Sequence, residues 1–371
     1  MRSETQPVLA RVNSTWTNVV ERYEQAQAQQ AASSIETNTE LLEDGGVRFV
    51  LKIAAALRDK PKPPAPSGGE KKEWRNPFLP YDEALWVQHL SPTHTLLLNK
   101  FNVVAHHVLV VTRQFESQRD PLNAQDMEAT WAVLQAMPHG GLAFYNCGPQ
   151  SGASQPHKHV QLVPLPLEGA SLHPSSTAAS DTGTRSPSSS SQGGSEDPGP
   201  PIWAAVAGSL QGAAPGQVVQ LASLPFAAFG VALPPAAEVT PQLLADAFAA
   251  ALDRCRGFVA AQASQQQQQR SPGGEAAHHH LESGSSGGGS ADTVRPGEGF
   301  SYNMLLTRRF LLLVPRSAEA DGPVSCNSVA FAGSFFVRSR EELEYVKGRG
   351  PMAVLTAVGF PWSLRAAEAQ S

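Results

Sequence analysis

The chain has 371 residues, of which 41% are hydrophobic, and a formal net charge of −5. This length suits one large domain or two ordinary ones, and the negative balance argues against a protein that binds nucleic acid through a basic surface. No apolar run is long enough to cross a bilayer, and the first residues lack the apolar core of a secretory signal. The three cysteines are widely spaced, so we expect a cytoplasmic protein without a disulfide framework.

The first half of the chain alternates helical and extended patterns. Apolar residues at three- and four-residue spacing predict a helix over residues 13–30. The segment 47–53 alternates apolar and basic residues, as a half-buried strand does. The segment 102–112 is nearly all apolar, which predicts a central strand. A further helix is expected after Asn123, which can cap it, and a strand at 142–146 follows.

Two segments without periodicity interrupt the second half. Residues 167–200 and 262–290 are rich in Ser, Gly, Pro or Gln, and we expect both to be disordered inserts. Between them, Thr240 and the proline after it predict the start of a helix. After them, residues 300–316 predict two strands joined by a basic turn. Helices feeding antiparallel strands predict an α+β fold with helices on one face of the sheet.

The most informative stretch is Ser-Gln-Pro-His-Lys-His-Val-Gln-Leu-Val-Pro at residues 154–164. Alternate side chains of a strand point the same way, so His157, His159 and Gln161 share one face. Two imidazoles and an amide in a row are a costly choice for a buried face unless they have partners. They suit the handling of a phosphate.

The loop just before this strand, residues 146–154, consists of small and polar residues. Glycines let main-chain N–H groups approach an anion closely, and serine hydroxyls add donors. The loop and the strand together suggest nucleotidyl transfer through a histidine. A His-x-His pair can also be half of a metal site, but that site needs a third ligand, and no His or Cys spacing completes a set.

These segments resemble a known family. The stretch from Asn146 to Gln161, the Leu-Leu-Asn-Lys-Phe pattern that includes Lys100, and the Ser-Tyr-Asn that includes Asn303 are similar to the diadenosine tetraphosphate phosphorylases, also called ATP adenylyltransferases. That family belongs to the histidine-triad-like superfamily, with galactose-1-phosphate uridylyltransferase. In the family, residues 326–333 would form a strand.

The resemblance covers most of the chain from about residue 47 to residue 364, apart from the two inserts. It implies a histidine-triad-like antiparallel sheet with flanking helices and two related parts. Residues 1–166 would be the catalytic part, and residues 201–366 the C-terminal ATP adenylyltransferase part.

The resemblance also implies a reaction, the phosphorolysis of diadenosine tetraphosphate to ADP and ATP. His159 would attack the α-phosphorus to give an adenylyl-histidine and ATP, and inorganic phosphate would then release ADP. His157 would fix the tautomer of the nucleophile. Gln161 would hold a phosphoryl oxygen, since an amide cannot act as an acid or a base. Transfer to phosphate, which is already an anion, needs less proton transfer than hydrolysis does.

Substrate-binding residues follow from the same resemblance. Lysines would neutralise phosphate charge, the loop would line the polyphosphate, and residues of the C-terminal part would help to bind the second nucleotide. The family often has Lys where this chain has Arg308. The expected set is Lys60, Lys100, Asn146, Ser151, Gly152, Ala153, Ser154, Gln161, Asn303, Met304, Thr307 and Arg308.

Expected ligands are diadenosine polyphosphates, ATP, ADP and inorganic phosphate, with neither nucleic acid nor membrane as a partner. A magnesium ion bound with the nucleotide is compatible with this chemistry, although no carboxylate pair marks a site for it. Two alternatives stay open. One is a nucleotide hydrolase or ADP sulfurylase of the same superfamily, and the other is a dinucleotide sensor without turnover. We interpret His106 and His107 as structural residues, because neighbours on a strand face opposite ways.

Overall fold

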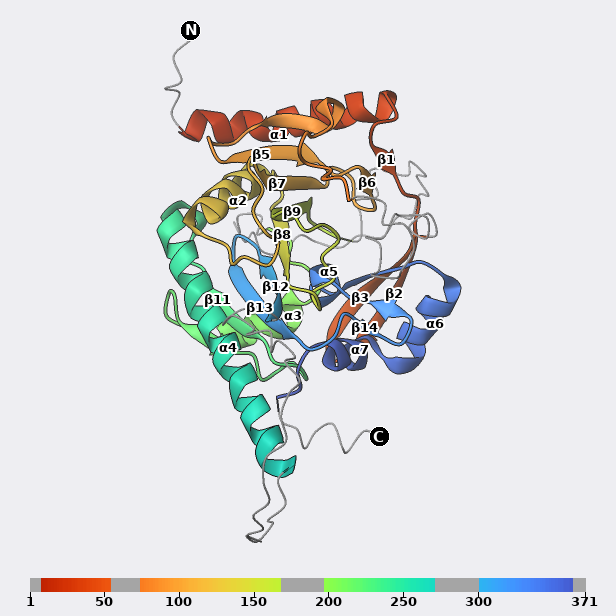
Figure 1. Ribbon diagram of the computed structural model, residues 1–371, viewed down its shortest axis with the longest axis vertical. Coiled ribbons are helices and arrows are strands. Elements are labelled where there is room, and N and C mark those ends of the chain that lie inside the picture. Colours follow the sequence, from red (N-terminus) through yellow and green to blue (C-terminus); the bar gives the residue numbers. More distant parts are fainter. Residues whose placement is uncertain (1–7, 55–73, 168–196, 271–299, 363–371) are drawn as a thin grey trace, which may run out of the picture.

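The computed structural model describes residues 8–54, 74–167, 197–270 and 300–362. A nine-stranded sheet in the order β10-β11-β13-β12-β8-β9-β7-β5-β4 forms the centre of the molecule (Figure 1). Each neighbouring pair in it is antiparallel. The strands are β4 (Trp86–His89), β5 (His94–Leu98), β7 (Val108–Thr112), β8 (Gly141–Cys147), β9 (His159–Pro164), β10 (Val218–Gln220), β11 (Phe229–Ala232), β12 (Ser301–Leu306) and β13 (Phe310–Arg316).

Three helices cover one face of this sheet: α1 (Val8–Ala28), α2 (Ala124–Ala136) and α4 (Pro241–Arg270) (Figure 1). Their apolar residues form one hydrophobic cluster with Val160 and Leu162, which point from β9 toward the helices. The expected α+β class and the alternation of the histidine strand are therefore confirmed.

The ends of these helices follow from local sequence. Asn123 caps α2 and forms a capping box with Asp126, and the Thr240 hydroxyl accepts from the third residue of α4. Helix α4 continues to Arg270, so residues 262–270 of the expected insert are helical. The rest of that insert, and residues 168–196 of the first one, lie outside the described residues.

A second layer packs on the opposite face. It contains α3 (Trp203–Leu210), α5 (Ser328–Phe331), α6 (Arg340–Arg349), α7 (Pro351–Val358) and a small sheet of β2 (Asn38–Asp44), β3 (Val47–Ile53) and β16 (Ser334–Val337). Short pieces complete the fold: β1 (Ser33–Ser34), β6 (Phe101–Asn102), β14 (Ala320–Asp321), β15 (Val324–Ser325), and the 3-10 turns η2 (Glu83–Leu85) and η3 (Ala236–Glu238).

The two expected parts of the chain share both sheets. Strand β12 of the second part pairs with β8 of the first, and β16 pairs in parallel with β3. A boundary between residues 166 and 201 therefore separates two stretches of sequence that fold around common sheets.

Two sequence predictions about strands are wrong. Residues 102–112 do not form one strand, because the chain turns between β6 and β7 with His106 at φ +58°. Residues 326–333 form no strand, because Asn327 caps the short helix α5. Within the described residues, no helix is both long enough and apolar enough to cross a membrane.

Candidate active site

A cavity of about 470 Å³ lies on the sheet face opposite the three helices. Strands β8 and β9 contribute Asn146 and Gln161 to its wall, and the loop between them contributes residues 152–155. The rest of the wall comes from the turn around residues 99–107 and from the C-terminal segment 319–338. Both halves of the chain therefore contribute to the cavity wall, and the histidine strand is part of it.

His159 lies at the start of β9 and is 4% exposed. Its Nδ1 atom is 2.8 Å from the main-chain oxygen of His157. A carbonyl oxygen only accepts hydrogen bonds, so the proton of a neutral His159 ring belongs on Nδ1. Nε2 then carries the lone pair, as the predicted role of nucleophile requires. The Phe78 ring packs 5.3 Å from the His159 ring.

His157 is fully buried and connects the histidine strand to two other segments. Its Nε2 lies 2.9 Å from both the main-chain oxygen and the hydroxyl of Thr112, and its Nδ1 lies 3.0 Å from the side-chain amide nitrogen of Asn76. Burial lowers the pKa of His157, so the ring is neutral at pH 7. Its side chain connects the histidine strand to Thr112 and Asn76, and its main-chain oxygen orients His159.

The side chain of Gln118 fills a gap between β8 and β9. Direct pairing of these strands ends at Phe144 and Gln161. Beyond that point the Gln118 Oε1 accepts a 2.8 Å bond from the His159 N–H, and its Nε2 donates to the main-chain oxygens of Asn146 at 2.9 Å and His159 at 3.3 Å. The amide thereby completes the hydrogen-bond ladder beside His159, the predicted nucleophile.

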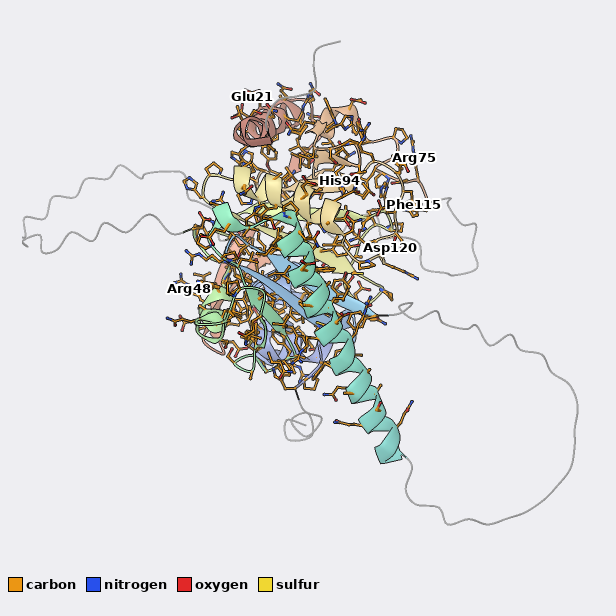
Figure 2. The ribbon with its side chains drawn as sticks, turned by 90° about the vertical axis from the view of Figure 1, so that its left-hand side faces the viewer. Glu21, Arg48, Arg75, His94, Phe115 and Asp120 are labelled. Carbon is orange, nitrogen blue, oxygen red and sulfur yellow. The ribbon has the colours of Figure 1, made fainter. Side chains whose placement is uncertain are left out.

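Lys158, between the two histidines, points to the helix side of the sheet. Its Nζ lies 2.9 Å from both Asp126 Oδ2 and Glu116 Oε2, and His94 Nε2 lies 2.9 Å from Asp126 Oδ1. Lys158, Asp126 and His94 are each nearly inaccessible, and His94 is labelled in Figure 2. This network fixes the histidine strand to the first turn of α2.

The side-chain amide of Asn146 has a defined orientation. Its Oδ1 accepts bonds from Asn303 Nδ2 at 2.8 Å, from the Ser328 N–H at 2.9 Å and from the Ser328 hydroxyl at 2.7 Å. Three donors on one oxygen identify that atom as the acceptor end of the amide. Nδ2 is consequently the end of Asn146 that can donate to a ligand in the cavity.

The loop after Asn146 bends sharply around Gly152, which has φ +76°. A Cβ atom at Gly152 would lie 2.6 Å from the main-chain oxygen of Cys326, so only glycine fits there. Gly152, Ala153 and Ser154 line the cavity. Ser151 is fully buried, and its hydroxyl donates to the Gly148 oxygen at 2.6 Å.

The side chain of Arg316 stabilises this loop through hydrogen bonds. Its buried guanidinium donates to the Ser151 oxygen at 3.3 Å and to the side-chain oxygen of Asn303, and also to four other main-chain oxygens, of Val358, Ala318, Glu319 and Cys326. Burial lowers the pKa of Arg316 to about 10, which leaves it protonated at pH 7. A fixed positive charge therefore lies behind the loop.

Comparison with known proteins identifies the family. The Ap4A phosphorylase N-terminal domain matches residues 5–176, and the ATP adenylyltransferase C-terminal domain matches residues 222–361. The chain belongs to the Ap4A phosphorylase family. The two matched regions leave out residues 177–221, which include most of the first expected insert.

Relatives and solved structures agree with this assignment. Diadenosine 5′,5‴-P1,P4-tetraphosphate phosphorylase 2 of Saccharomyces cerevisiae is 27% identical over 299 residues, which are 76% of this chain and 74% of that protein. Protein APA1 of the same yeast is 29% identical over 144 residues, 36% of this chain and 43% of that protein.

The fold matches solved structures of yeast Ap4A phosphorylase Apa2. The complex with AMP has a TM-score of 0.64 at 23% identity, over 94% of this chain and 98% of that one. The complex with Ap4A has a TM-score of 0.66 at 23% identity, over the same shares. These matches confirm the expected histidine-triad-like fold.

The structure brings only some of the predicted binding residues of this Ap4A phosphorylase family member to the cavity. Asn146, Gly152, Ala153, Ser154 and Gln161 line it. Lys100 is exposed, and its neighbours in sequence on either side line the cavity. Lys60 lies outside the described residues.

Residues of the second part that were expected to touch nucleotide have other contacts. Asn303 is buried beneath the loop, and Met304 belongs to the hydrophobic cluster under the helices. The Thr307 hydroxyl accepts from the main-chain N–H groups of Arg309 and Phe310, two and three residues later in its turn. Arg308 pairs with Asp197 at 2.9 Å and donates to the last carbonyls of α2. Met304, Thr307 and Arg308 are thus not brought to the cavity.

Sequence reasoning missed several residues that build the site, above all Asn76, Gln118, Arg316 and Ser328. All of them act through long-range contacts that no local pattern reveals. His107, interpreted as structural, lines the cavity; its Nδ1 lies 3.1 Å from the Asn99 amide nitrogen.

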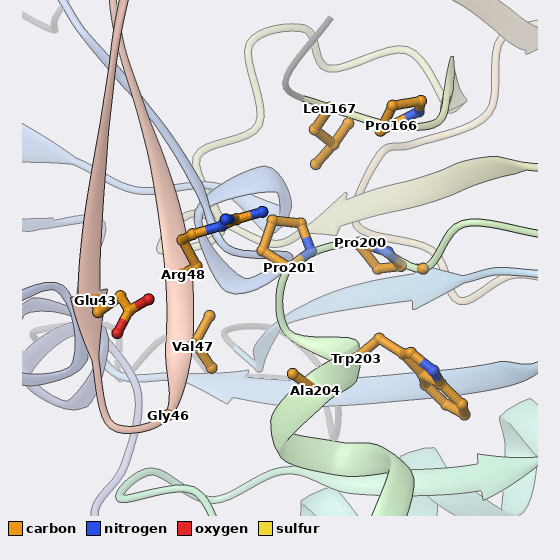
Figure 3. A pocket seen from close by; sticks show the side chains of 11 residues that line it. Glu43, Gly46, Val47, Arg48, Pro166, Leu167, Pro200, Pro201, Trp203 and Ala204 are labelled. Atoms are coloured by element: carbon orange, nitrogen blue, oxygen red, sulfur yellow. The ribbon is translucent and has the colours of Figure 1, made fainter. Parts of the chain in front are cut away.

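A second cavity, of about 430 Å³, lies between the β2–β3 hairpin and residues 199–204 (Figure 3). Its wall includes Arg48, Trp203 and several prolines, and it contains none of the predicted catalytic residues. Among the described residues, no group of three or more His, Cys, Asp or Glu side chains is arranged to hold a metal ion.

Proposed function

We propose that this protein catalyses the phosphorolysis of diadenosine tetraphosphate to ADP and ATP through an adenylyl-histidine at His159. One observation carries the proposal: the His159 Nδ1 bond to the His157 oxygen, which presents Nε2 as the nucleophile at the start of β9. Family membership and the yeast Ap4A phosphorylase structures support the choice of reaction.

The reaction has two transfers at one phosphorus. Nε2 of neutral His159 forms an N–P bond to the α-phosphorus, and the P–O bond to the leaving ATP breaks. An oxygen of inorganic phosphate then forms a P–O bond to the same phosphorus. The N–P bond breaks, its electron pair returns to Nε2, and ADP leaves. Each cycle restores the neutral imidazole, so the ring needs no external base.

The main-chain oxygen of His157 contributes more than orientation. When Nε2 is bonded to phosphorus, the ring carries a positive charge and Nδ1 keeps its proton. The 2.8 Å bond from Nδ1 to the carbonyl then becomes charge-assisted and strengthens as the intermediate forms. An interaction stronger in the intermediate than in the free enzyme lowers the barrier to the first transfer.

The cavity wall offers donors for the phosphoryl oxygens. The lining residues Asn146, Gly152, Ala153, Ser154 and Gln161 carry such donors in their side-chain amides and main-chain N–H groups. Removing one such donor typically raises the barrier by about 2.7–4 kcal/mol. Gln161 offers no titrating group, so it favours an acceptor that is already an anion over water.

The ligands proposed for this cavity are diadenosine polyphosphates, ATP, ADP and inorganic phosphate. A reducing compartment, the cytoplasm, is proposed on chemical grounds. Cys147, Cys255 and Cys326 are free and buried, and such thiols need no oxidising environment.

Product analysis with diadenosine tetraphosphate, with and without inorganic phosphate, tests the proposal. ADP plus ATP that appear only with phosphate would support it. AMP plus ATP without phosphate would establish a hydrolase and contradict the argument from Gln161. Bound but unchanged substrate would establish a sensor.

The nucleophile is tested by His159→Ala, with His139→Ala as a control at an exposed histidine outside the cavity. His159→Ala should abolish turnover and leave dinucleotide affinity within a few-fold. An acid-labile adenylyl group should be trapped on the wild-type and His139→Ala proteins only. Turnover at the wild-type rate in His159→Ala would overturn the assignment.

A further inference from the structure

One strand of the C-terminal part presents an unusual series of side chains to the cavity. Ser334 and Phe336 of β16 and Arg338 just after it are two residues apart, so they lie on the same side of the strand. All three line the cavity. Phe335 and Val337 alternate with them and are buried in the hydrophobic cluster of this layer, against which Phe336 also packs, and Phe335 borders the cavity as well.

Ser334 is the most informative member. It is 1% exposed, and its hydroxyl has no hydrogen-bond partner among the residues that the structure describes. Nearly all buried polar groups in proteins are hydrogen-bonded, so an exception in a cavity wall calls for an explanation. A hydroxyl can donate and accept, which suits the neighbouring donor and acceptor atoms on the edge of a purine.

Phe336 and Arg338 supply what the rest of a nucleotide needs. Phe336 is half-buried, and aromatic rings bind bases by stacking. Arg338 is also half-buried, and a guanidinium suits phosphate oxygens. From the first to the last of these residues the strand advances about 13 Å, the scale of a nucleoside 5′-phosphate.

Other lining residues favour the same occupant. One part of the cavity wall is apolar, and it consists of Phe101, Val103 and Val104 from the turn before β7 with Phe144 and Val163 from the sheet. Such a wall suits the flat faces of a base, and a few polar groups then fix its orientation.

We propose that Ser334, Phe336 and Arg338 bind one purine nucleoside 5′-phosphate end of the substrate. Ser334 contacts the edge of the base, Phe336 its face, and Arg338 the phosphate. The inference rests on the proposed function, and it places the nucleotide contact of the C-terminal part on β16 instead of on residues 303–308.

Ser334→Ala is the central test, with AMP and diadenosine tetraphosphate as probes. Thr130→Val is the matched control, because the Thr130 hydroxyl is also buried without a partner among the described residues, but in α2 under the other face of the sheet. Neither change removes a hydrogen bond between described residues, so neither should lower the thermal midpoint. Ser334→Ala should weaken AMP binding about tenfold and raise KM for the dinucleotide similarly, with kcat within twofold.

Two more variants test the contacts to the base and to the phosphate separately. Phe336→Leu should weaken adenosine and AMP about equally, whereas Arg338→Gln should weaken AMP and leave adenosine unchanged. Arg338→Lys should restore part of the AMP affinity. Wild-type AMP affinity in folded Ser334→Ala, or in both Phe336→Leu and Arg338→Gln, would overturn the proposal.

The two proposals can fail separately. Turnover by the wild-type protein with unaltered KM in the β16 variants would leave the phosphorylase and remove this binding site. Absence of wild-type turnover, with AMP binding weakened by Ser334→Ala but not by Thr130→Val, would leave the binding site and remove the phosphorylase.

Discussion

The Gln118 side chain accepts a 2.8 Å hydrogen bond from the main-chain N–H of His159 where the pairing of β8 and β9 has ended. The same amide donates to the main-chain oxygens of His159 and Asn146. One residue from a loop thus holds His159, the proposed nucleophile, and Asn146, a proposed phosphate-binding residue, at a fixed separation.

Replacing Gln118 by Met should disturb both strands. Three main-chain groups would lose their partner, and leaving buried polar groups unsatisfied costs about 1–3 kcal/mol for each. Since main-chain shifts and water would relieve part of this, we expect the free energy of unfolding in urea to fall by about 2–4 kcal/mol. We expect kcat to fall at least about tenfold. Gln217→Met, in an exposed turn, should change neither quantity.

Replacing Lys158 by Met should destabilise the protein through Asp126. The change leaves a buried carboxylate that has lost its cation, and breaking a buried pair in this way costs about 3–5 kcal/mol. Lys347→Met is the matched control, because Lys347 pairs with Glu40 and Glu344 at the surface. Its denaturation midpoint should stay close to that of the wild type. Equal midpoints for the two variants would contradict a role for the buried pair.

The same pair predicts a pH dependence. Burial alone would raise the pKa of Asp126, but the His94 hydrogen bond and the Lys158 charge outweigh it and hold the pKa below its usual value. Burial alone would lower the pKa of Lys158, but the Asp126 charge outweighs it and raises the pKa above its usual value. The stabilisation should therefore be complete between about pH 5 and about pH 9.

Below that window the carboxylate is protonated as the pH falls toward its lowered pKa, and above it Lys158 loses its proton as the pH rises through its raised pKa. The stability difference between wild type and Lys158→Met should be flat from pH 5 to about pH 9 and should shrink below about pH 4. Urea midpoints across this range measure the difference. A difference that grows on acidification would contradict the assigned signs.

The histidine strand and its surroundings show what sequence can predict. Alternation places Val160 toward the helices and Gln161 toward the cavity, because a strand has a strict period of two. The cap at Asn123 followed from residue type and position alone. These are local rules, and each was sufficient for its element.

Contacts between distant residues were beyond such rules. Nothing local distinguishes Gln118, an amide in a loop, from other glutamines, and Arg316 fits the expectation for a strand end. Their roles arise from contacts between residues that are distant in sequence. Gln118 binds Asn146, which is 28 positions away, and Arg316 binds Ser151, which is 165 positions away. Asn303 and Met304 were expected at the nucleotide because of the family pattern, whereas burial places them beneath the loop and in the core.

Gly152→Ala should lower the catalytic activity, whereas the matched change Gly212→Ala should lower only the stability. Both Gly152 and Gly212 have positive φ, at +76° and +79°, so alanine strains the backbone at either position by about 1–2 kcal/mol. Only at Gly152 would the added methyl group collide, 2.6 Å from the Cys326 oxygen, whereas nothing lies within 4 Å at Gly212.

The loop must then move away from the C-terminal segment, and with it the Gly152–Ser154 donors. Gly212→Ala should lose stability and keep full kcat/KM, whereas Gly152→Ala should lose at least about tenfold in kcat/KM as well. Steady-state kinetics beside thermal denaturation of both variants separate the two effects. Full activity in Gly152→Ala would show that the loop has no part in catalysis.

Replacing Arg316 by Lys should remove hydrogen bonds that hold the loop, although the positive charge is kept. Lysine has three donors on one nitrogen, so it cannot reach the oxygens of Ser151, Asn303 and Cys326 together as the planar guanidinium does. Several buried acceptors would be left unpaired, and the free energy of unfolding should fall by at least about 2 kcal/mol.

Arg349→Lys serves as the control for this change, because Arg349 pairs with Asp321 at the surface. Its urea midpoint and kinetics should match those of the wild type. Arg316→Lys should also raise KM for the dinucleotide more than KM for inorganic phosphate, since the loop is proposed to line the polyphosphate. Equal increases in both KM values would indicate that Arg316 stabilises the fold as a whole and does not position the loop.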